Sequence, residues 1–85
     1  MRQSTAVERT LSHLYQEHGQ DTTIRANGLL LTFERDSSGT YYLYVYNNSD
    51  YDTFEFELDN TLPYPIKLKY IDKTIADKIV GCQMN

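Results

Sequence analysis

The stretch from Thr40 to Leu58 constrains the fold of this chain more than any other, because its side chains alternate with a period of two. Phe54, Phe56 and Leu58 fall on one face of an extended segment, and the glutamates between them fall on the other. This pattern is typical of a strand that is buried on one side only. We therefore predict a strand over 52–58 with one face in the core.

The segment before it, 40–47, alternates in the same way but is rich in tyrosine, which favours strands. One face is suited to a core and comprises Tyr41, Leu43 and Val45. The other face consists of tyrosines alone: Tyr42, Tyr44 and Tyr46. The link 48–51 contains turn-forming residues, so we predict that the two strands pair as a hairpin. Such pairing would place the tyrosine row beside Glu55 and Glu57.

The N-terminal part of the chain predicts a helix from about Ala6 to His18. Thr5 and Glu8 have the spacing of a capping box, and Gly19 supplies a stop signal. The apolar residues that recur at helical spacing include Val7, Leu11 and Leu14. We expect the opposite helix face, which includes Glu8 and Ser12, to be an ordinary solvated surface.

Two further strands are predicted before the tyrosine-rich segment, and one after the hairpin. Segments 22–26 and 29–35 flank Asn27-Gly28, the dipeptide that most favours a tight type I′ turn. Segment 66–70 alternates apolar residues with lysines, and its pairing with the preceding strand would set those lysines beside the glutamates. A short helix over 72–80 follows.

The predicted fold class is therefore α+β: an N-terminal helix, a four- to five-stranded antiparallel β-meander and a short C-terminal helix. The 85 residues leave room for a single domain, 1–85. Cys82 is the single cysteine, so no intramolecular disulfide is expected. No apolar run approaches the length of a membrane span or a secretion signal. We expect a soluble cytoplasmic protein without membrane contact.

No residue pattern in the sequence predicts an enzyme or a metal site. His13 and His18 would diverge by about 140° around a helix, so they cannot chelate one metal ion together. Cys82 has no neighbouring base or cation of the kind that activates a catalytic thiol. Glu55 and Glu57 share one strand face, whereas a glycosidase needs two carboxylates across a cleft. We expect a non-enzymatic protein with no catalytic residues, no metal and no cofactor.

The hairpin region has an unusual composition. Between Arg35 and Lys67 there is no lysine or arginine, whereas six of the eight tyrosines and half of the acidic residues lie there. Tyrosine is enriched at interfaces because it buries a large rigid area while its hydroxyl group still finds a partner. Nearby acids steer a basic partner and raise its association rate. The candidate partner-binding residues are Tyr42, Tyr44, Tyr46, Tyr51, Asp52, Glu55 and Glu57.

We interpret the chain as a protein-binding module, a small acidic inhibitor or adaptor that places this surface against a basic surface of a larger protein. In general character it resembles phage-encoded inhibitors of nucleic-acid-handling enzymes, and this resemblance implies acids in place of phosphates and tyrosines in place of stacked bases. One alternative is a structural homodimer whose tyrosine face is its own interface. Another is weak binding of single-stranded nucleic acid or carbohydrate by stacking on the tyrosines, although the net charge of -4 disfavours nucleic acid.

Overall fold

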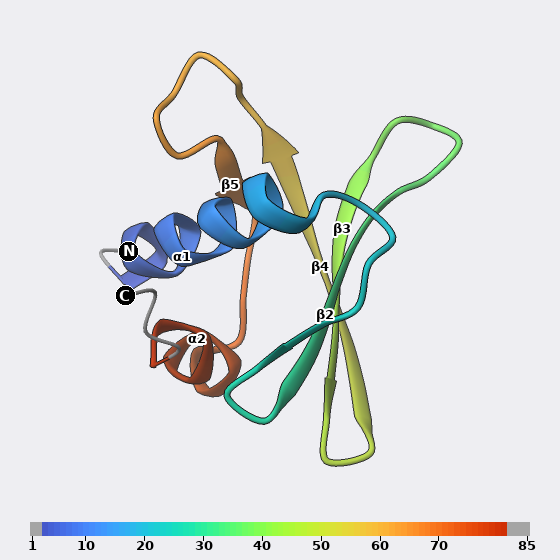
Figure 1. Cartoon of the computed structure of the whole chain (residues 1–85), viewed down its shortest axis with the longest axis vertical. Coiled ribbons are helices and arrows are strands. Elements are labelled where there is room, and N and C mark those ends of the chain that lie inside the picture. The colour runs from blue at the N-terminus through green and yellow to red at the C-terminus, as the bar shows by residue number, and fades with distance from the viewer. Residues whose placement is uncertain (1–2, 82–85) are drawn as a thin grey trace.

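Five antiparallel strands and two helices make up the fold in a computed structural model that describes residues 3–81 (Figure 1). The elements are α1 (Gln3–His18), β1 (Ile24–Ala26), β2 (Leu29–Arg35), β3 (Tyr41–Asn47), β4 (Asp50–Leu58), β5 (Ile66–Leu68) and α2 (Lys73–Val80). The strands lie in the sheet in the order of the chain, β1-β2-β3-β4-β5. The predicted α+β architecture is confirmed, with five strands in the meander.

Both helices lie on the same side of the sheet, and the hydrophobic core fills the space between the two layers (Figure 1). The sheet contributes alternate residues of its three central strands, and the buried ones are Leu29, Leu31, Phe33, Leu43, Val45, Phe54 and Phe56. The helices contribute Val7, Leu11, Leu14, Ile75, Ala76 and Ile79. We call this side of the sheet the covered face and the opposite side the open face.

The beginning of α1 differs from the predicted capping box. The helix starts at Gln3, so Thr5 lies within it instead of at its N-cap. The carboxylate of Glu8 accepts a hydrogen bond from the backbone N–H of Leu68 at 2.7 Å. Glu8 therefore contacts β5, and the capping-box prediction was wrong.

Ser12 is also engaged with β5, although it was predicted to lie on a solvated helix face. Its side chain is fully buried, and its hydroxyl oxygen accepts a hydrogen bond from the N–H of Ile66 at 3.0 Å. This bond and the bond from Leu68 to Glu8 satisfy two backbone N–H groups of β5 that point away from β4. Helix α1 thus closes the outer edge of β5, while within residues 3–81 no side chain bonds the backbone of β1 in the same way.

Two hairpin turns set the register of the central strands. Asn27 and Gly28 have φ values of 50° and 81°, and Asn48 and Ser49 have φ values of 52° and 76°. Two positive φ values are the requirement of a type I′ turn, which matches the twist of the strands that it joins. The second turn is shorter than the predicted link, and β4 begins at Asp50. Tyr51 consequently belongs to a strand.

No helix among the described residues is long and apolar enough to cross a membrane. Cys82, which the sequence singled out as a plain thiol, lies outside the described residues.

Candidate functional site

The register of the sheet collects four tyrosines on the open face. Across β3 and β4, Tyr42 lies opposite Glu55, Tyr44 opposite Thr53, and Tyr46 opposite Tyr51. The ring centroids of Tyr46 and Tyr51 are 4.7 Å apart, and those of Tyr42 and Tyr44 are 6.2 Å apart. These separations are within the range of favourable aromatic contacts. We call Tyr42, Tyr44, Tyr46 and Tyr51 the tyrosine cluster.

The tyrosine cluster remains accessible to solvent. Tyr51 is 80% exposed and Tyr44 is 39% exposed, while Tyr42 and Tyr46 are half-buried. Loss of solvent around its hydroxyl group, together with the negative charges of Asp36 and Glu55, raises the pKa of Tyr42 above its ordinary value. Its phenol therefore stays protonated at neutral pH and can donate a hydrogen bond to a partner.

Two adjacent hollows lie beside the tyrosine cluster. One, of about 250 Å³, is lined by Thr23, Leu30, Thr32, Tyr44, Val45, Tyr46 and Tyr51. The other, of about 500 Å³, is lined by Arg25, Gly28, Leu29, Leu30, Tyr46, Asn48 and Ser49. Leu30 and Tyr46 separate the two hollows and belong to both. The open face is therefore shallowly hollowed at the end of the sheet where the two hairpin turns lie, and the smaller hollow is mainly apolar whereas the larger one is mainly polar.

The predicted acidic residues are divided between the two sides of the sheet. Asp52 lies opposite Val45, whose side chain is buried, so Asp52 belongs to the exposed hairpin end of the covered face and does not join the tyrosine cluster. Glu55 and Glu57 do lie on the open face. The Lys69 ammonium group is 3.6 Å from the Glu55 carboxylate and 3.5 Å from that of Glu57. The expected lysine–glutamate contact is present, and it partly neutralises the acidic row.

Charges on the open face are balanced in number, and two of the cations, Lys67 and Lys69, lie beside glutamates. The cations are Arg25, Lys67 and Lys69, and the anions are Glu34, Glu55 and Glu57. Glu34 and Glu55 flank Tyr42 in one cross-strand row. Arg25 begins another row, which continues through Leu30 and Tyr46 to Tyr51. The face is thus acidic beside Tyr42 and cationic beside Tyr46.

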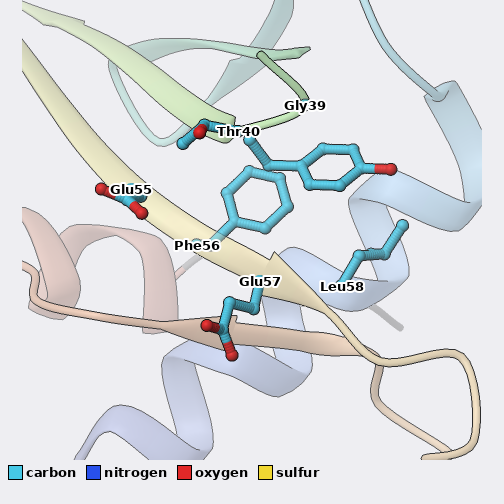
Figure 2. Close-up of a pocket in the computed structure, with 7 residues that line it drawn as sticks. Gly39, Thr40, Glu55, Phe56, Glu57 and Leu58 are labelled. Atoms are coloured by element: carbon cyan, nitrogen blue, oxygen red, sulfur yellow. The ribbon is translucent and has the colours of Figure 1, made fainter. Parts of the chain in front are cut away.

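A further hollow, of about 400 Å³, lies where β3 and β4 diverge (Figure 2). Its lining comprises Gly39, Thr40, Tyr41, Glu55, Phe56, Glu57 and Leu58. The rings of Tyr41 and Phe56 stack at 5.4 Å, whereas Glu55 and Glu57 lie on the other side of the strand (Figure 2). Its polar groups do not converge on one point, and both carboxylates already contact Lys69. This arrangement supplies no nucleophile paired with a base.

Each histidine of α1 lies beside another side chain. The His13 ring lies 5.7 Å from the Tyr64 ring, and a His18 ring nitrogen lies 3.9 Å from a Glu17 carboxylate oxygen. His18 is exposed. Within residues 3–81 no group of three or more histidine, cysteine, aspartate or glutamate side chains could hold a metal ion.

Sequence reasoning did not identify three residues of the open face: Arg25, Leu30 and Thr32. Leu30 and Thr32 alternate with the core residues of β2, and this alternation was a usable signal. Arg25 lies on a strand of three residues, which is too short to show a pattern.

Comparisons of the chain with known protein families, with curated protein sequences and with solved structures found no match. The function must therefore be argued from the open face itself. Its main features are the tyrosine cluster, the two hollows and the charged residues beside them.

Proposed function

We propose that this protein is a non-enzymatic binding module, an inhibitor or adaptor that docks the tyrosine cluster on a larger protein. The observation that supports this function is the position of four tyrosines on the sheet face that neither helix covers. Accessible apolar and aromatic surface on a small domain commonly marks an interaction site, and tyrosine is enriched at such sites. Rigid strands hold the rings, so little conformational entropy is lost on binding.

The proposed partner presents a largely basic surface. The chain has a net charge of -4, and the exposed Asp50 and Asp52 lie at the end of the β3–β4 hairpin beside the open face. At the other end of the cluster, Glu34 and Glu55 flank Tyr42. These acids would accelerate encounter with a basic surface and help to orient it. A protein that handles nucleic acid is a natural candidate, because small acidic inhibitors can occupy a site built for phosphates.

Site-specific cross-linking tests this docking mode. A photoreactive phenylalanine analogue at position 44 should cross-link a larger protein in an extract, whereas the analogue at position 70 should not. Tyr70 is a matched control because it is 69% exposed but packs beside Phe54 on the covered face. With the captured protein, Tyr44→Ala should weaken binding at least tenfold, a loss of about 1.4 kcal/mol, and Tyr70→Ala should not. Equal cross-linking from both positions would contradict the proposal.

A homodimer is a second candidate because the open face has equal numbers of cations and anions. A twofold axis through the tyrosine cluster could pair the acidic end of one copy with the lysines of the other, in the self-complementary way of such interfaces. Light scattering over a wide concentration range distinguishes the two candidates. A mass that doubles with concentration, and returns to that of one chain in Tyr44→Ala, would favour the homodimer over the binding module.

A further inference from the structure

Arg25 differs from every other residue that lines the two hollows. It is the only charged side chain among them, and it is exposed at the edge of the larger hollow. Within residues 3–81 its guanidinium group makes no ion pair with a carboxylate. A cation is therefore available beside an apolar surface.

The other arginines of the described chain contact aromatic rings instead of lining a hollow. The guanidinium carbon of Arg35 lies 5.5 Å from the centre of the Tyr41 ring, and that of Arg9 lies 5.1 Å from the centre of the Tyr64 ring. These cation–π contacts occupy their planar faces within the protein. Arg25 has no such contact among the described residues, so a ligand in the hollow could bond its guanidinium group.

The row that begins at Arg25 places this cation close to the apolar surface. Arg25 pairs with Leu30, and Leu30 pairs with Tyr46, so neighbouring side chains of the row are one strand spacing apart, about 4.8 Å. The hollow between them, of about 500 Å³, is within the size range of sites that bind small ligands. A short segment of a partner could therefore contact both ends of the row at once.

We infer that the two hollows bind a segment of the partner in which an apolar side chain lies beside a carboxylate. The apolar side chain packs against Leu30, Tyr44 and Tyr46, and the carboxylate bonds the Arg25 guanidinium group. A guanidinium group binds a carboxylate through two parallel hydrogen bonds, and nearby apolar rings strengthen them by excluding water. This inference rests on the proposed function and adds the chemistry of the bound segment.

Arg25 and Glu34, which lie in different rows of the open face, also give the bound partner an orientation. Its carboxylate lies toward β1, and its basic residues lie toward Glu34 and Glu55 on either side of Tyr42. The reverse orientation would bring the carboxylate toward Glu34 and basic residues toward Arg25, which is unfavourable. The partner is thus basic overall but has one acidic residue at a defined place.

A random nine-residue peptide library tests the inference without knowledge of the partner. Peptides selected on the wild-type protein should share an apolar or aromatic residue with aspartate or glutamate within three positions of it. Selection on Arg25→Gln should lose the acidic residue, and selection on Arg9→Gln should keep it. Both arginines are exposed, so circular dichroism should show that both variants fold.

A double-mutant cycle with one selected peptide then assigns the contact. Changing the acidic residue of the peptide to its amide should weaken binding to the wild-type protein about tenfold, and should have no effect on binding to Arg25→Gln. Equal weakening in both proteins, selected peptides without acids, or no selection at all would overturn the inference. Cross-linking from position 44 does not depend on an acidic residue in the partner. The proposed function can therefore hold even if the peptide experiments overturn this inference.

Discussion

The two faces of this sheet are made by alternate residues of the same strands, but they are built for different purposes. On the covered face Phe33 and Phe56 are fully buried, and their ring centroids are 5.8 Å apart. On the open face Tyr44 follows the buried Leu43 directly and is 39% exposed. The contrast teaches that neighbouring residues of one strand can be changed separately, one in the core and the next on the proposed binding surface.

The strongest test of this separation compares Leu43→Ala with Tyr44→Ala. Leu43→Ala leaves a cavity in the core and should lower the free energy of unfolding by about 2–5 kcal/mol. Tyr44→Ala should lower it by less than about 1 kcal/mol, because it loses only cross-strand contacts on an accessible face. Urea unfolding measures both values. Similar losses in the two variants would show that the open face also holds the fold together.

Ser12→Ala tests the buried hydrogen bond between α1 and the edge strand β5 on the covered face. The variant leaves the buried N–H of Ile66 without its acceptor, which should cost about 1–3 kcal/mol. Ser37→Ala, at an exposed turn position, serves as the matched control and should have little effect. Hydrogen exchange of the Ile66 amide should accelerate in Ser12→Ala alone. Unchanged exchange would mean that another group satisfies this donor.

The smallest expected effect concerns the turn beside the acidic end of the open face. The Asp36 carboxylate accepts hydrogen bonds from the Ser38 hydroxyl group and from the N–H groups of Ser38 and Thr40, and these bonds lower its pKa. Because the pKa is lower in the folded state than in the unfolded state, the contribution to stability is present above the unfolded pKa. It is lost as the pH falls through the folded pKa.

Ser38→Ala should therefore raise the pKa of Asp36 toward its ordinary value and reduce the loss of stability on acidification. An NMR titration of the Asp36 carboxyl group measures the first effect, and urea unfolding at neutral and acidic pH measures the second. Binding through the tyrosine cluster should be unchanged at neutral pH. A lower pKa of Asp36 in the variant would contradict the assignment of the hydroxyl group as a donor.

The sequence predicts those parts of the molecule that depend on local pattern. The strand Leu29–Arg35 was predicted with its observed bounds, and the pairing of Glu57 with Lys67 follows from alternation in two neighbouring strands. Asp52 was misplaced because it was grouped with the glutamates by charge and not by side-chain alternation. Its alternation with Phe54 already indicated the covered face.

Other features depend on contacts between distant parts of the chain. Ser12 and Ile66 are 54 positions apart, and a serine on a polar helix face gives no sign that a strand will dock on it. The hollow beside Arg25 likewise forms only when β1, β2 and β3 are adjacent. Local patterns therefore predict the layers of this fold, whereas the polar contacts between elements require the structure.

The closed edge of β5 determines how this sheet can grow. A strand that approached β5 would find the N–H groups of Ile66 and Leu68 already bonded to Ser12 and Glu8. Growth of a fibre by edge-to-edge strand pairing requires every copy to offer two edge strands with free backbone groups, and within residues 3–81 only β1 is such a strand. If two copies paired through β1, neither would retain an edge strand with free N–H groups, so strand pairing would not extend beyond a dimer. Helix α1 thereby limits polymerisation as well as completing the core.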